Sequence, residues 1–155
     1  MRAPLRLALC GLLLAAATSF AEDEVEPPSG HKAEVRKMAG TYRVVRLERG
    51  PKAAGPGDLA TMKVVLGKDG NGSFTAHGED TTSRFTTFPN KKPKQVDCTY
   101  TSGPAKGMTI KGIYKIEKGV LTCCYGSPGG ERPTKFETGG DERLVLYALE
   151  RVQEK

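Results

Sequence analysis

Residues 107–136 decide the fold of this chain, and they read GMTIKGIYKIEKGVLTCCYGSPGGERPTKF. Between Met108 and Glu117, apolar and polar side chains alternate with the period of a half-buried β-strand. Gly119 supplies a turn, and Val120–Tyr125 has the β-branched, aromatic and apolar residues of a return strand. The stretch therefore predicts an antiparallel hairpin, followed by a Gly/Pro-rich loop that cannot continue the sheet.

Three groups of residues form an ordered pattern along the chain. They are Gly40, Thr41, Tyr42, Val44 and Val45 near the start, Gly103, Pro104, Ala105, Lys106 and Gly107 in the middle, and Gly112, Ile113, Tyr114, Leu121, Cys124, Arg132, Pro133, Thr134 and Phe136 near the end. Together they resemble the signature of a paralogous domain family of planctomycete bacteria, whose members are mostly exported and uncharacterised. The resemblance spans residues 35–151, and it departs from the family at Tyr42, where Trp is usual.

The resemblance implies an all-β fold of the lipocalin-like, or calycin-like, type. This is an eight-stranded antiparallel up-and-down barrel with a short N-terminal helical turn that plugs one end. In such barrels a C-terminal arginine often lies over the opening aromatic residue, so we expect Arg151 to stack on Tyr42. The resemblance implies no reaction, and it makes its signature residues structural.

The strand pattern of the chain favours the same fold independently. Eight segments have strand composition: 41–48, 61–66, 73–77, 81–88, 94–101, 108–117, 120–125 and 143–151. None has the helical period of a βαβ crossover, and eight strands close into a small barrel that holds one modest ligand or only its own side chains. A helical turn is expected at Ala33–Ala39, while residues 49–60 form either a lid at the mouth or a simple elaboration.

The first 21 residues have the pattern of a secretory signal peptide. Arg2 and Arg6 precede the apolar run Leu7–Ala17, and cleavage is expected after Ala21. Removing 21 of the 155 residues leaves 134 and lowers the formal net charge from +6 to +4. We therefore predict an exported protein, periplasmic or extracellular, with no transmembrane anchor after cleavage. Residues 22–32 are predicted to be a disordered linker with an exposed His31, and residues 33–155 one barrel domain.

Charge and cysteine usage do not indicate a nucleic-acid, metal or redox site. The only tight basic cluster is Lys91, Lys92 and Lys94, which we interpret as a solvated loop that discourages edge-to-edge pairing. In a meander Cys98 lies two strands, ~10 Å, from the other cysteines, beyond the ~7 Å limit for a disulfide.

Two further cysteines are adjacent in one strand. Cys123 and Cys124 are therefore expected on opposite faces. With Cys98 they predict two buried thiols and one partly exposed thiol, with no metal and no cofactor.

Candidate catalytic residues are scattered through the chain. His77, Glu79 and Asp80 have the ordinary composition of a turn, and Ser127 lies outside any nucleophile-elbow context. We therefore predict no catalytic residues.

Three hypotheses about function stay open. The first is an exported non-enzymatic barrel that binds a small apolar ligand in its cup, or an envelope or other protein partner on its rim. The second is a purely structural or interaction module of the cell envelope. The third is a hydrolase- or lyase-like enzyme, which would require several of Asp97, Thr99, Glu117, Arg132 and His77 to converge in one pocket.

Overall fold

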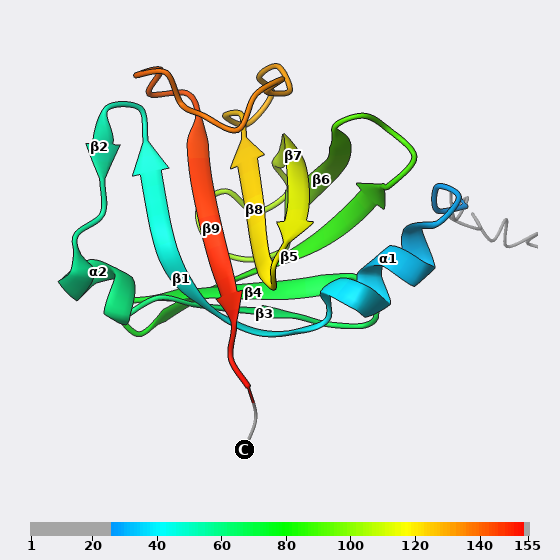
Figure 1. Ribbon diagram of the computed structural model, residues 1–155, viewed down its shortest axis with the longest axis horizontal. Helices are drawn as coiled ribbons and strands as arrows, with labels where there is room; N and C mark the ends of the chain where they lie inside the picture. Colours follow the sequence, from blue (N-terminus) through cyan, green and yellow to red (C-terminus); the bar gives the residue numbers. More distant parts are fainter. Residues whose placement is uncertain (1–25, 154–155) are drawn as a thin grey trace, which may run out of the picture.

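A computed structural model of the protein describes residues 26–153, which form a nine-stranded antiparallel sheet and two short helices (Figure 1). The elements are α1 (His31–Met38), β1 (Gly40–Arg49), β2 (Lys52–Ala53), α2 (Pro56–Ala60), β3 (Lys63–Leu66), β4 (Asn71–Ala76), β5 (Glu79–Phe88), β6 (Lys94–Tyr100), β7 (Thr109–Glu117), β8 (Val120–Tyr125) and β9 (Val145–Arg151). The predicted signal peptide and residues 22–25 of the predicted linker lie outside the described residues.

Eight of the strands close into a barrel. Each strand from β3 to β8 pairs with the next one along the chain, and β1 pairs with both β3 and β9. The ninth strand, β2, adds only two residues beside the end of β1. The predicted all-β, up-and-down barrel is therefore confirmed, and every predicted strand is present with its ends within two residues of the expected positions.

A bulge in β1 changes which side chains of the second half of that strand point into the barrel. The register with β9 shifts between Val44 and Arg46, which leaves Val45 exposed. Val44 is buried inside the barrel before the bulge, and Leu47 packs against the same core after it. Because side chains alternate along a strand, Arg49 follows Leu47 on the inner side, where β1 reaches the rim.

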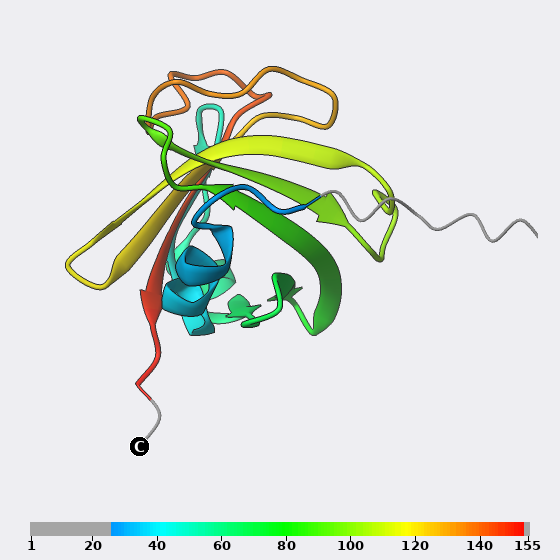
Figure 2. The same ribbon diagram turned by 90° about the vertical axis from the view of Figure 1, so that its right-hand side faces the viewer.

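Helix α1 lies across one end of the barrel (Figure 2). Its Val35 and Met38 are buried in the main core. The helix was expected from Ala33 but begins at His31, so the prediction of an exposed linker residue there was wrong. The His31 ring is half-buried and accepts a hydrogen bond of 3.0 Å from the backbone N–H of Thr87 through Nδ1. The sequence around His31 is polar and Pro/Gly-rich, and it does not reveal this partner 56 residues away.

The predicted contact between Arg151 and Tyr42 is present. These residues are paired across β1 and β9, and the guanidinium carbon lies 5.4 Å from the centre of the Tyr42 ring. Arg151 Nη2 also donates to Tyr42 Oη at 2.9 Å and to the carbonyl of Lys37 in the last turn of α1 at 2.6 Å. The Tyr42 hydroxyl in turn donates to the Met38 carbonyl at 2.7 Å. The pair therefore ties the C-terminal end of α1 to the strands that close the barrel.

The Gly/Pro-rich loop after β8 covers the outside of the sheet. Phe136 packs there against Ile113, Cys124 and Leu146, whose side chains point away from the barrel interior and form a second, smaller core. Thr138, which is also buried, donates a hydrogen bond of 2.7 Å to the carbonyl of Gly50. The loop therefore contributes to folding as well as connecting β8 to β9.

Gly112 marks a close approach between β7 and β8. A Cβ atom at this position would lie 2.5 Å from Cδ1 of Tyr125 and 2.7 Å from the Cys124 carbonyl oxygen. The Cys124 carbonyl cannot move away without disturbing the pairing of β7 with β8, because it belongs to the paired strand. The glycine in this part of the signature therefore has a packing reason.

Candidate ligand cavity

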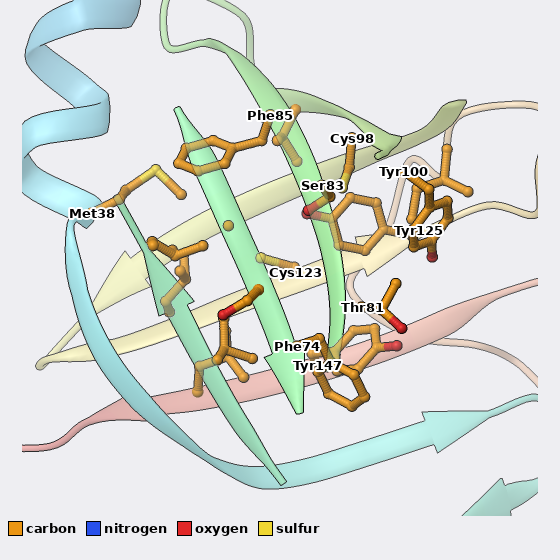
Figure 3. A pocket seen from close by; sticks show the side chains of 18 residues that line it. Met38, Phe74, Thr81, Ser83, Phe85, Cys98, Tyr100, Cys123, Tyr125 and Tyr147 are labelled. Carbon is orange, nitrogen blue, oxygen red and sulfur yellow. The ribbon is translucent and has the colours of Figure 1, made fainter. Parts of the chain in front are cut away.

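A cavity of about 260 Å³ lies inside the barrel. Eighteen residues line it, from α1 and from every barrel strand except β1 (Figure 3). Met38 and Phe85 stand at the end closed by α1, and Tyr100, Tyr125 and Tyr147 stand at the other end. An apolar protein cavity of ~150 Å³ can hold benzene. By the same scale this cavity holds about ten non-hydrogen atoms.

Burial changes along the barrel axis. At the α1 end, Phe85, Val96 and Tyr114 are almost fully buried and fill the interior. Toward the other end the inward side chains are only half-buried, including Phe74 and Tyr100. The barrel is therefore packed at its floor and hollow toward its mouth. The interior is thus filled at the end that α1 closes and open at the other end.

The mouth is built from aromatic rings. Tyr147 on β9 meets Phe74 on β4 edge to face at 6.0 Å and Tyr125 on β8 at 6.3 Å. This is the geometry that aromatic pairs prefer, and it holds the rings in place without closing the cavity. The strand pattern puts them there, because Tyr100 and Tyr125 each lie two residues after an inward cysteine.

Every side chain that lines the cavity is uncharged. The polar groups among them are hydroxyls and thiols, including Ser83, Cys98 and the mouth tyrosines. Burial raises the pKa of the Cys98 thiol and of Tyr100, and it raises the pKa values of Cys123 and Tyr147 to about 12. The cavity wall therefore stays neutral over the whole physiological range of pH.

A buried ionic cluster holds the floor together. Glu34 of α1 accepts hydrogen bonds from Lys94 Nζ at 2.7 Å and from the Tyr114 hydroxyl at 3.0 Å, and Lys37 lies 3.6 Å from its second oxygen. Burial alone would raise the pKa of Glu34, but the two hydrogen bonds and the charges of both lysines outweigh it, so the pKa is lowered. The carboxylate is therefore ionised, and it fixes α1 to β6 and β7.

This cluster corrects part of the interpretation of the basic loop. Lys91 and Lys92 are exposed in the turn between β5 and β6, as expected for a solvated loop. Lys94 is not part of that loop, because it begins β6 and pairs with Glu34. Nothing local in the sequence predicts this contact, since 60 residues separate the two partners.

The residues required by the enzyme hypothesis do not meet in the cavity. Asp97 lies on the outer side of β6, where its carboxylate accepts a hydrogen bond of 2.7 Å from Arg132. Arg132 also donates to the carbonyls of Val96 and Gly112, so it anchors the long loop to the sheet. Thr99 is hydrogen-bonded to Thr109 across β6 and β7.

The remaining candidates lie in a turn and at the end of a strand. His77 is exposed and stands 3.7 Å from Asp58 of α2. Glu117 is exposed and pairs with Lys115 at the end of β7. Within residues 26–153 no group of three or more His, Cys, Asp or Glu side chains is placed to hold a metal ion.

The cysteines lie as the strand pattern predicts. Cys98, Cys123 and Cys124 are free thiols, with the last two buried and Cys98 partly exposed. Cys123 lines the cavity, whereas Cys124 belongs to the outer core and lies 3.8 Å from the Glu137 carbonyl. Adjacent positions in β8 therefore serve two different cores.

Comparison of the chain with protein-family models, with curated proteins and with solved structures found no match in any of the three. The closed eight-stranded antiparallel barrel is compatible with a lipocalin-like fold. Of the helices in the described part of the chain, none has both the length and the apolar character needed to cross a membrane.

Proposed function

We propose that the protein is an exported, non-enzymatic barrel that binds a small, largely apolar ligand in its cavity. The observation that carries the proposal is the cavity of about 260 Å³, which is lined by buried apolar side chains toward α1 and by half-buried aromatic rings at the mouth. Burying an apolar ligand there would remove its surface and that of the wall from water, at about 25 cal/mol per Å². Export and membership of the planctomycete family are parts of the proposal that rest on the sequence patterns alone.

A rim that binds an envelope or other protein partner has less support. The large apolar side chains exposed among residues 26–153 are Val45, Met108, Ile116 and Val152. They come from four separate segments: the β1 bulge, the turn before β7, the end of β7 and the residue after β9. We therefore place the ligand inside the barrel.

The proposal is tested by titrating the protein with naphthalene, a neutral probe of about the size that the cavity holds. Ser83→Leu would fill part of the cavity from β5, and Arg84→Leu is its control, because Arg84 is the next residue along and is exposed. We expect naphthalene to bind the parent and Arg84→Leu with similar affinity and to bind Ser83→Leu at least tenfold more weakly.

Native mass spectrometry of protein purified gently from its own host gives an independent readout. A co-purified molecule lost in Ser83→Leu would agree with the proposal. Equal binding of naphthalene to all three proteins would remove the cavity as the binding site, and so would failure of the parent to bind either naphthalene or oxygen-bearing aromatic probes of the same size.

A further inference from the structure

We infer that the cavity selects a neutral ring compound that carries a hydroxyl group, and discriminates against anions of the same size. This inference rests on the proposed function, because it names the class of ligand for the same site. It is carried by the chemistry of the wall, in which hydroxyl and thiol groups are set among apolar surfaces without one charged side chain.

Placing a charged ligand in the cavity is unfavourable. A buried ion requires a countercharge or several strong hydrogen bonds to replace its water shell. A cation that acts on the mouth is Arg49, which is exposed at the end of β1. Its charge lowers the pKa values of Tyr100 and Tyr147, but burial outweighs it and both values stay raised. The cost of burial therefore exceeds the attraction of Arg49 even for the hydroxyls on which Arg49 acts, and an anionic ligand would meet the same cost.

The tyrosine hydroxyls at the mouth favour a ligand that carries a polar atom. Tyr100 and Tyr147 both line the cavity. Among the described residues no side-chain oxygen that is shut off from solvent lacks a hydrogen-bond partner, so the hydroxyls of these two tyrosines, which make no side-chain hydrogen bond within the protein, are open to water. In the free protein water can serve these groups. A hydrocarbon that displaced the water would leave them unsatisfied, which costs about 1–3 kcal/mol for each buried group. A ligand oxygen that reaches them avoids this cost.

The aromatic side chains of the wall favour a ligand with a flat ring. Phe74, Tyr125 and Tyr147 present ring edges and faces to the same space, and Phe85 forms the inner wall (Figure 3). Aromatic walls make offset and edge-to-face contacts best with another flat ring. A ring of about ten non-hydrogen atoms with its oxygen directed to the tyrosine end satisfies all three conditions.

The test compares 4-nitrophenol with 4-nitrotoluene, which has the same number of non-hydrogen atoms but a methyl group in place of the hydroxyl. Nitrophenol ionises near neutral pH, so titrations below and above its own pKa present the neutral phenol and then the phenolate to one protein. The wall does not ionise in this interval, because burial raises the pKa of Cys98 and of the tyrosines. Nitrotoluene carries no ionisable group, and its affinity at the two pH values controls for any change in the protein itself.

We expect the phenol to bind at least fivefold more tightly than nitrotoluene. We also expect it to bind at least tenfold more tightly than the phenolate, once both affinities are corrected by the ratio of the nitrotoluene affinities at the two pH values. Arg49→Gln should leave the affinity for the phenol within twofold. Phenolate binding as tight as phenol binding, or nitrotoluene binding as tight as phenol binding, would overturn the inference while leaving a hydrophobic cup. Failure of naphthalene and of both nitro compounds to bind would instead defeat the proposed function, and the inference with it.

Discussion

Replacing Arg151 by alanine should lower the free energy of unfolding by about 2–3 kcal/mol. Three contacts are lost: the stacking on Tyr42, the hydrogen bond to the Tyr42 hydroxyl and the hydrogen bond to the Lys37 carbonyl. Stacking contributes roughly 0.5 kcal/mol at an exposed site, and a hydrogen bond from a charged donor contributes about 1.5 kcal/mol at the low end of its range. The low ends sum to about 3.5 kcal/mol. We expect a smaller loss, about 2–3 kcal/mol, because the Arg151 side chain is exposed and water weakens its contacts.

Arg43→Ala is the matched control. Arg43 lies on the same strand pair and forms an ion pair of 2.6 Å with Glu150, but both members of this pair are exposed to solvent. Such pairs contribute about 0.2–1 kcal/mol. Urea unfolding should therefore separate the two variants by more than 1 kcal/mol, and the melting temperature of Arg151→Ala should fall by roughly 7–10 °C. Equal stability of the two variants would refute the reasoning that Arg151 holds α1 in place.

A double-mutant cycle with Tyr42→Phe divides the effect further. The phenylalanine keeps the ring under the guanidinium and removes only the hydroxyl, which accepts from Arg151 and donates to Met38. We expect a coupling energy of about 0.5–1.5 kcal/mol between the two changes. Zero coupling would assign the whole contribution of Arg151 to the ring and to the helix carbonyl.

Three further predictions concern packing, pH and thiol reactivity. Gly112→Ala should destabilise the protein by about 1–3 kcal/mol, because its Cβ overlaps Tyr125 and the backbone of Cys124; the control Gly57→Ala, with nothing within 4 Å of the added atom, should be neutral or slightly stabilising in denaturant melts. Burial and the charge of Lys32 lower the pKa of His31, whose Nδ1 must stay unprotonated to accept from Thr87, so the free energy of unfolding should fall as the pH drops below 6.5 toward the folded-state pKa. In His31→Asn, which keeps an acceptor but cannot titrate, stability should be flat between pH 6.5 and the onset of Glu34 protonation below 4.5, and an unchanged pH slope would contradict the assignment. Iodoacetamide should alkylate the three cysteines slowly in the native protein and rapidly in urea, because burial raises their pKa values; fast native labelling of Cys123 would contradict its placement.

The alternation of side chains was enough to predict the barrel and much of its lining. It placed Val96, Cys98 and Tyr100 on one face, and these residues all line the cavity. It also placed Cys123 and Cys124 on opposite faces of one strand, which the two cores confirm. A period of two survives in the sequence because each strand is buried on one side only over most of its length.

Contacts between distant segments were not predictable in the same way. Glu34 lies in a polar helix and gave no sign of being buried, because its partners Lys94 and Tyr114 come from two other strands. The bulge that exposes Val45 and turns Arg49 toward the mouth depends on the register with β9, and no residue type marks it. The floor and the rim of the cavity are thus set by tertiary contacts, whereas its wall is set by local pattern.

A crystal structure of the protein under xenon pressure would show whether the barrel interior is hollow. Xenon enters small apolar cavities without requiring any particular hydrogen-bonding partner. We expect ordered xenon between Phe85 at the floor and the three tyrosines at the mouth, with the barrel otherwise unchanged. An interior in which these side chains meet and leave no room for xenon would contradict it.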